Sequence, residues 1–148
     1  MRRILIIAIV TFLTIGTVVA VAYSGLISLG EPDLKLAFEP APPWRLRPLE
    51  ALEIDLGVEN NAWTLATAKD VRVTIELPEG FSASGSTTQW QKEYGAIRGG
   101  ESRGDTLSLE VTSNVRVGNY TISVRLQAAN TREQVLPITA IIELPYIP

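Results

Sequence analysis

The sequence of 148 residues predicts an all-β fold, an antiparallel sandwich of about seven strands, preceded by one N-terminal transmembrane helix. Two observations support this fold class. Residues 4–22 carry no charge, and the rest of the chain holds successive segments in which apolar and polar residues alternate. Such alternation is typical of antiparallel strands with one buried and one solvated face. We therefore divide the chain into an anchor, residues 1–30, and one extracytoplasmic domain, residues 31–148.

The uncharged run at residues 4–22 reads ILIIAIVTFLTIGTVVAVA. As a helix it spans roughly 28 Å, which matches the hydrocarbon core of a bilayer. Apolar residues continue as far as Leu29. Arg2 and Arg3 precede the run, so the positive-inside rule places the N-terminus in the cytoplasm and the C-terminal domain outside. We expect a single-pass protein of the cell membrane whose first partner is the lipid bilayer.

A secretory signal peptide is the alternative for this segment. Residues 20–22 read AVA, a small-residue pattern for cleavage after Ala22, and the two arginines would form the basic region that precedes the apolar run. The chain would then be secreted. The uncharged run is longer than the usual apolar region of a signal peptide, and no helix breaker precedes the cleavage pattern, which favours a retained anchor.

The first strand follows a proline-rich segment. Five of the nine prolines lie between residues 31 and 48, and such segments are stiff and extended. Within this segment Leu34, Leu36 and Phe38 alternate with polar or small residues, which predicts a half-buried strand. The run APPW at residues 41–44 then predicts a stiff crossover.

Five more segments alternate with a period of two, and a seventh, weaker strand mixes polar and aromatic residues. In chain order the predicted strands are residues 52–59, 71–77, 89–94, 107–111, 120–127 and 136–144. Turn residues separate several of them, namely PEG at 78–80, GGES at 99–102 and GN at 118–119. The only plausible helical stretch, residues 65–70, is too short to change the fold class.

Composition excludes several kinds of chemistry. The chain has no cysteine and no histidine, which removes disulfides, thiolate nucleophiles, the usual zinc sites and Ser-His-Asp triads. Its net charge of −3 does not suit nucleic acid. The carboxylates of Glu53, Asp55 and Glu59 share one strand face without a calcium-binding loop, so they predict a solvated face. We expect no catalytic residue, no cofactor and no metal, and hence no enzyme.

Several motifs resemble a family of bacterial and archaeal domains. The first half has VENN at residues 58–61, AKDVRV at 68–73 and LPEGF at 77–81, and the second half has GGES at 99–102 and GNYTISV at 118–124. In order and spacing these resemble CARDB and NPCBM-associated domains. The resemblance implies an immunoglobulin-like antiparallel β-sandwich that serves outside the cell as a spacer or adhesion module, and it carries no catalytic residues.

The predicted anchor and domain together suggest a function. One N-terminal helix followed by an immunoglobulin-like domain is similar to the layout of archaellum stator proteins and of proteins associated with a surface layer. We therefore expect a non-enzymatic module that contacts a protein of the cell envelope, the surface layer or a surface appendage. Two alternatives remain open at this point: a carbohydrate-binding module that contacts a glycan, and an accessory subunit of a membrane enzyme complex.

Aromatic residues supply the first candidate contact surface. Trp44, Trp63 and Trp90 lie in or beside predicted loops, and exposed aromatic rings stack on sugars or anchor protein partners. Trp90 and Tyr94 are the preferred pair, because their segment is otherwise polar, and Trp63 completes the surface. In the alternative interpretation the tryptophans cap the ends of the sandwich.

The last strand supplies a second candidate surface. Its core-facing residues are expected to run through Leu144. Pro137 cannot donate a hydrogen bond to a neighbouring strand, which predicts a sheet edge around this residue. Exposed Val135 and Ile141 beside unpaired backbone would favour the addition of a strand from another chain. In the alternative interpretation Pro137 blocks such pairing.

Residues 119–121 read NYT, an acceptor pattern for N-glycosylation. Because Tyr120 is expected to face inward, Asn119 faces outward and is a candidate for glycosylation in a host that modifies exported proteins. Tyr120 also resembles the tyrosine corner of Greek-key sandwiches, in which the hydroxyl holds the preceding crossover. The alternative is a core tyrosine with a solvated hydroxyl.

Overall fold

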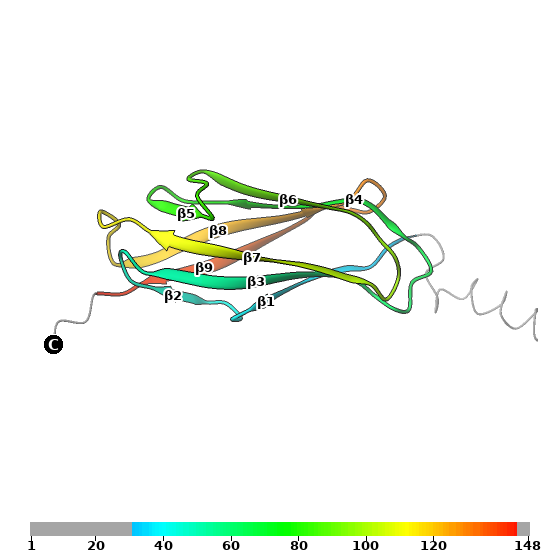
Figure 1. Ribbon diagram of the computed structural model, residues 1–148, viewed down its shortest axis with the longest axis horizontal. Coiled ribbons are helices and arrows are strands. Elements are labelled where there is room, and N and C mark those ends of the chain that lie inside the picture. The colour runs from blue at the N-terminus through cyan, green and yellow to red at the C-terminus, as the bar shows by residue number, and fades with distance from the viewer. Residues whose placement is uncertain (1–30, 145–148) are drawn as a thin grey trace, which may run out of the picture.

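A computed structural model describes residues 31–144, which form a two-sheet sandwich of nine strands (Figure 1). The first sheet has the spatial order β1 (Leu34–Glu39), β3 (Ala51–Asn60), β7 (Ser102–Val111) and β5 (Phe81–Ala83). The second has the order β2 (Trp44–Leu46), β9 (Gln134–Ile142), β8 (Gly118–Gln127), β4 (Ala68–Glu76) and β6 (Gln89–Ile97). The predicted all-β sandwich is confirmed.

All seven predicted strands form, and the sequence missed two. The missed strands, β2 and β5, have three residues each, too few to show a period of two. The stretch at residues 65–70 forms no helix; its second half is the beginning of β4, where Ala68 pairs with Ile97 of β6. Tertiary pairing therefore decides the structure where the local pattern is ambiguous.

The strand order follows the Greek-key arrangement of immunoglobulin sandwiches. The neighbours β1-β3-β7-β5 correspond to strands A, B, E and D of that fold, and β9-β8-β4 correspond to G, F and C. The chain changes sheets between β1 and β2, through residues 40–43, as the proline run predicted. Trp44 fastens this crossover, because its indole Nε1 donates a hydrogen bond to the carbonyl oxygen of Pro40 at 3.0 Å.

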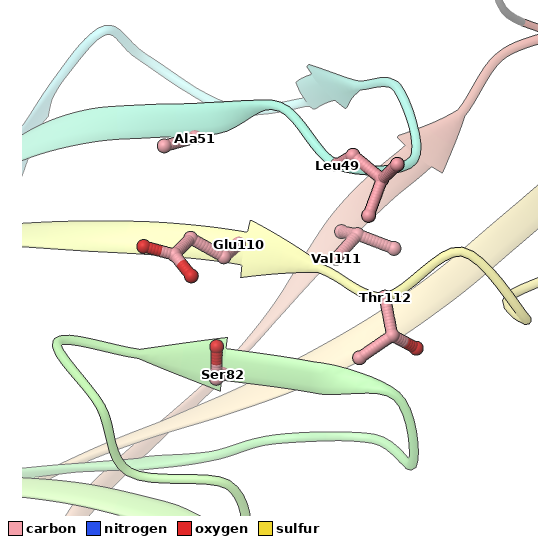
Figure 2. A pocket seen from close by; sticks show the side chains of 6 residues that line it. All are labelled: Leu49, Ala51, Ser82, Glu110, Val111 and Thr112. Carbon is pink, nitrogen blue, oxygen red and sulfur yellow. The ribbon is translucent and has the colours of Figure 1, made fainter.

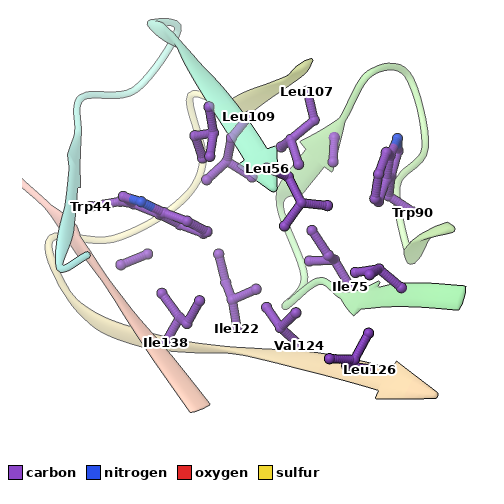
Figure 3. Packing of buried hydrophobic residues seen from close by; sticks show 14 of the residues in the cluster. Trp44, Leu56, Ile75, Trp90, Leu107, Leu109, Ile122, Val124, Leu126 and Ile138 are labelled. Carbon is purple, nitrogen blue, oxygen red and sulfur yellow. The ribbon is translucent and has the colours of Figure 1, made fainter. Parts of the chain in front are cut away.

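One continuous apolar core fills the space between the sheets. Figure 3 shows Trp44 and Trp90 on opposite sides of this core, with residues such as Leu56 and Val124 between them. The predicted core positions of the last strand are confirmed at Ile138, Ala140 and Ile142, whereas Leu136 is only half-buried and Leu144 is 72% exposed. Leu144 lies beyond the end of β9, so no strand pairing directs its side chain inward.

The described chain starts and finishes at opposite ends of the sandwich (Figure 1). We call the end at which the described chain starts the proximal end; it contains Glu31, the start of β1, the loop between β3 and β4 and the turn between β6 and β7. We call the opposite end the distal end; it contains Leu144, the turn between β2 and β3 and the loop between β7 and β8. Strand pairing agrees, because Leu34 lies opposite Asn60 and Gly118 lies opposite Ile142.

The predicted membrane span, residues 4–22, lies outside the described residues. Among residues 31–144, the structure contains no helix that is long and apolar enough to cross a bilayer.

Candidate functional site

The aromatic residues predicted to form one contact surface lie in three different environments. Trp63 is 80% exposed in the loop between β3 and β4, Tyr94 is half-buried, and Trp90 is buried with 9% exposure. The expectation for Trp90 is wrong. It pairs with Ile75 of β4, and because paired residues of antiparallel strands point to the same face, its ring enters the core. Trp63 alone keeps the predicted exposure.

Tyr94 lies beside an ion pair that joins the two sheets, between Lys92 of its own strand β6 and Asp105 of β7. Burial raises the pKa of Tyr94 to about 12, and the negative charge of Asp105 adds to this rise. Lys92 Nζ lies 2.6 Å from Asp105 Oδ2, and its hydrogen bond lowers the pKa of that carboxyl. The Tyr94 hydroxyl has no hydrogen-bond partner among residues 31–144. Tyr94 therefore remains a neutral phenol at physiological pH and is not suited to act as a base.

The free edge of β9 is shorter than the sequence predicted. β2 covers the last three residues of β9, with Ile141 opposite Arg45, so the free edge comprises residues 134–139. The Glu143 amide donates to the Leu46 carbonyl of β2 at 3.0 Å, and alternation along the strand turns the nitrogen of Pro137 to the same side. The edge at Pro137 is confirmed. Ile141, half-buried between two strands, does not belong to it, whereas Val135 is 56% exposed on it.

The loop between β7 and β8 is held by Tyr120. Its hydroxyl donates a hydrogen bond to the carbonyl oxygen of Arg116 at 2.9 Å, and its ring packs on Phe81 with 5.2 Å between centroids. This geometry confirms the tyrosine-corner prediction, since the hydroxyl fastens the segment that precedes its own strand. Asn119 is exposed, so its amide is accessible as predicted. Its glycosylation stays a prediction.

The distal end presents apolar side chains that the sequence analysis did not single out. We call Leu49, Val117 and Leu144 the distal surface; they are 80%, 54% and 72% exposed. Leu49 follows Pro48 in the turn before β3, where its amide donates to the Val111 carbonyl at 2.9 Å. The sequence feature that could have predicted this surface is an apolar residue, Leu49, inside a turn. Turns are usually polar, so a leucine after Pro48 is unusual.

A shallow pocket of about 370 Å³ adjoins the distal surface (Figure 2). It lies across β3, β7 and β5, and Figure 2 shows Leu49 above Val111 at its distal side. Its lining residues are Leu49, Ala51, Ser82, Glu110, Val111 and Thr112. Glu110 is the one ionisable group in this lining, so the pocket offers a single carboxylate and no acid–base pair. Among residues 31–144 no three His, Cys, Asp or Glu residues group closely enough to hold a metal.

Asn60 connects four segments at the proximal end. Its side chain is fully buried; Oδ1 accepts a hydrogen bond from the Asp33 amide at 3.1 Å, and Nδ2 donates to the carbonyls of Ala66 and Ile97 at 2.9 Å each. In the turn between β6 and β7, the carbonyl oxygen of Glu101 accepts a hydrogen bond from the Asn60 backbone amide, and the Gly100 amide donates one to the Asn60 carbonyl. In the sequence, Asn60 stood out only as part of the VENN motif at residues 58–61, with no structural role assigned to it. Periodicity could not reveal its role, because its partners lie far away in the chain.

The loop between β3 and β4, which carries Trp63, is held on the same framework. The Asn61 amide donates to the Asp33 carbonyl at 2.9 Å, and the Thr64 hydroxyl donates to the carbonyl oxygen of Glu31 at 3.0 Å. Gly99 lies beneath the loop, where an added Cβ would stand 1.9 Å from the Thr64 carbonyl oxygen. The loop therefore packs closely against the turn between β6 and β7 and against the start of the described chain.

These features define a small β-sandwich module with exposed apolar residues at both ends. The chain matches no family model and no curated protein in sequence. In structure it is similar to the CARDB domain of the PF1109 protein from Pyrococcus furiosus, described in complex with di-metal ions. The TM-score is 0.51 at 16% identity, over 80% of this chain and 97% of that chain.

A second solved structure with a similar fold is AvmM, described as catalysing macrocyclization in alchivemycin A biosynthesis. The TM-score is 0.50 at 10% identity, over 79% of this chain and 92% of that one. At these identities the likeness concerns the fold alone, and one fold hosts many activities. The resemblance to CARDB domains is thus confirmed as a CARDB-like β-sandwich.

Proposed function

We propose that this chain is a non-enzymatic, membrane-anchored immunoglobulin-like module, which contacts a protein of the cell envelope, the surface layer or a surface appendage through its distal end. The observation that carries the proposal is that the first and last described residues, 31 and 144, lie at opposite ends of the sandwich. An anchor attached ahead of Glu31 would hold the proximal end at the membrane, and the long axis of the sandwich would carry the distal surface away from it (Figure 1). Such an arrangement serves a spacer that presents a contact surface.

The distal surface has the chemistry of a protein contact. Leu49, Val117 and Leu144 offer apolar area at one end, and the adjoining pocket adds the carboxylate of Glu110. Apolar side chains rimmed by polar groups are typical of protein interaction sites. Burying one leucine side chain at a contact contributes about 2 kcal/mol.

The structure supports the alternative functions less well. A sugar platform would need neighbouring exposed rings, but Trp90 lies in the core and Trp63 stands at the proximal end. An enzyme would need convergent polar groups, whereas the pocket beside the distal surface has one ionisable side chain. We therefore propose no activity for the chain itself.

Photo-crosslinking from single positions tests the proposed contact. A photoreactive phenylalanine analogue replaces Leu49 or Val117 in the full chain, expressed in its native membranes. We expect both positions to form an adduct with one envelope or appendage protein, identified by mass spectrometry. The matched control replaces Asp55, which is exposed in the middle of β3, between the two ends of the sandwich. Adducts from Asp55 but not from the distal positions would contradict the proposal.

A further inference from the structure

The loop between β3 and β4, residues 61–67, presents two large apolar side chains on one side. Trp63 and Leu65 are 80% and 71% exposed, and Thr64 between them is buried. Single exposed apolar residues are common on protein surfaces. Here, however, a tryptophan and a leucine flank a residue that points inward, so both project outward from the same loop. We call residues 61–67 the Trp63 loop.

Internal contacts hold the Trp63 loop in one conformation. The Trp63 amide donates to Asn61 Oδ1 at 3.1 Å, and the Ala66 amide donates to the Thr64 hydroxyl at 3.2 Å. The Thr64 amide donates to the Asn61 carbonyl at 3.1 Å. Because the loop is already ordered in this way, it loses little conformational entropy when its apolar side chains bind a partner surface.

The position of the loop indicates which surroundings its apolar side chains enter. Thr64 bonds the carbonyl of Glu31, and Asp33 is bonded to both Asn60 and Asn61. The apolar N-terminal sequence continues as far as Leu29, two residues before Glu31. Two residues span at most about 7 Å. Glu31, the described residue that follows the apolar sequence, is therefore hydrogen-bonded to the loop that carries Trp63 and Leu65.

We propose that the Trp63 loop rests on the outer surface of the bilayer that holds the N-terminal segment, with Trp63 and Leu65 inserted at the level of the lipid headgroups. This inference rests on the membrane anchor of the proposed function. Tryptophan is enriched at membrane interfaces, because its ring is apolar while its N–H bonds headgroups or water. Together with the anchor, the loop gives the domain a second membrane contact and fixes its long axis relative to the membrane.

A fluorescent probe on the loop tests the contact, and the absence of native cysteine makes a single label simple. The variant Leu65→Cys carries an NBD group in the full chain, reconstituted into phosphatidylcholine–phosphatidylglycerol vesicles with a doxyl quencher near the headgroups. The matched control is Val117→Cys at the distal end. We expect blue-shifted emission and strong quenching from residue 65, and neither from residue 117. A further Trp63→Ser change should reduce the quenching.

The outcomes separate the two proposals. If the protein floats with the vesicles and the probe at residue 65 is as unquenched as the one at residue 117, the loop contact is overturned and the anchor stands. If the protein does not float with the vesicles, the anchor fails and this inference fails with it. A blue shift at residue 65 without doxyl quenching indicates a protein neighbour, such as a second copy, and also overturns the inference.

Discussion

Replacing Trp44 by alanine lowers the free energy of unfolding by about 3–5 kcal/mol, the expected range for deleting a buried tryptophan. The side chain is 2% exposed and closes one side of the core. Its ring meets Phe38 edge-on at 5.5 Å between centroids, and its Nε1 bonds Pro40. The substitution leaves a cavity and also frees the crossover between the two sheets. Chemical denaturation of the full chain in detergent, followed by circular dichroism, measures the change.

The chain contains its own control for this substitution. Trp63→Ala removes the same side chain from a position with 80% exposure, and exposed substitutions usually change stability by less than about 0.5 kcal/mol. The two variants therefore separate burial from residue type. Equal losses of stability in Trp44→Ala and Trp63→Ala would contradict the assignment of Trp44 to the core.

Replacing Asn60 by alanine is the second large effect, with an expected loss of about 3 kcal/mol. The substitution leaves the carbonyls of Ala66 and Ile97 and the amide of Asp33 without their side-chain partner. Each unsatisfied buried polar group costs about 1–3 kcal/mol, although water entering the gap offsets part of this cost. Denaturation measures the loss, and hydrogen exchange at the Thr64 and Ala66 amides reports the loosening of the Trp63 loop.

Two variants control the Asn60 experiment. Asn60→Asp keeps the acceptor for the Asp33 amide but loses both donors, so it should also destabilise the protein. Asn61→Ala removes a side chain that is less buried and bonds Asp33 Oδ2 and the Trp63 amide, so its loss should be smaller. If Asn61→Ala cost more than Asn60→Ala, Asn60 would not be the residue that fastens the proximal end.

The long elements of the fold could be predicted because a half-buried strand records its buried face directly in the sequence. β3, β8 and β9 alternate over nine or ten residues each, and their buried positions follow the pattern. β2 and β5 could not be predicted, since three residues gain their strand conformation from neighbours distant in the chain. The alternation of residues also did not show where β9 ends. For this reason Leu144 was expected in the core, although it lies beyond the strand and is exposed.

The surfaces were harder to predict than the strands. The predicted aromatic pair failed at Trp90, because only the register with β4 shows that its ring faces the core. The expectation that Ile141 lies on a free edge is wrong, because no pattern in the sequence predicts that the short strand β2 covers it. Pro137 and Tyr120 were predicted correctly, since the missing amide of one and the hydroxyl of the other act on neighbouring backbone. The distal surface could not be predicted, because its three residues come from separate segments that only the fold brings to the same end of the sandwich.

Labelling of one cysteine in spheroplasts tests the central claim, a membrane-anchored domain outside the cytoplasm. Ser113→Cys places a thiol at an exposed position of the distal end, in a chain with no other cysteine. We predict that a membrane-impermeant maleimide labels this residue before lysis, and that the labelled full-length chain stays in the membrane pellet after an alkaline carbonate wash. Labelling only after lysis would contradict the claim, as would recovery of the domain from the medium as a chain beginning near Tyr23.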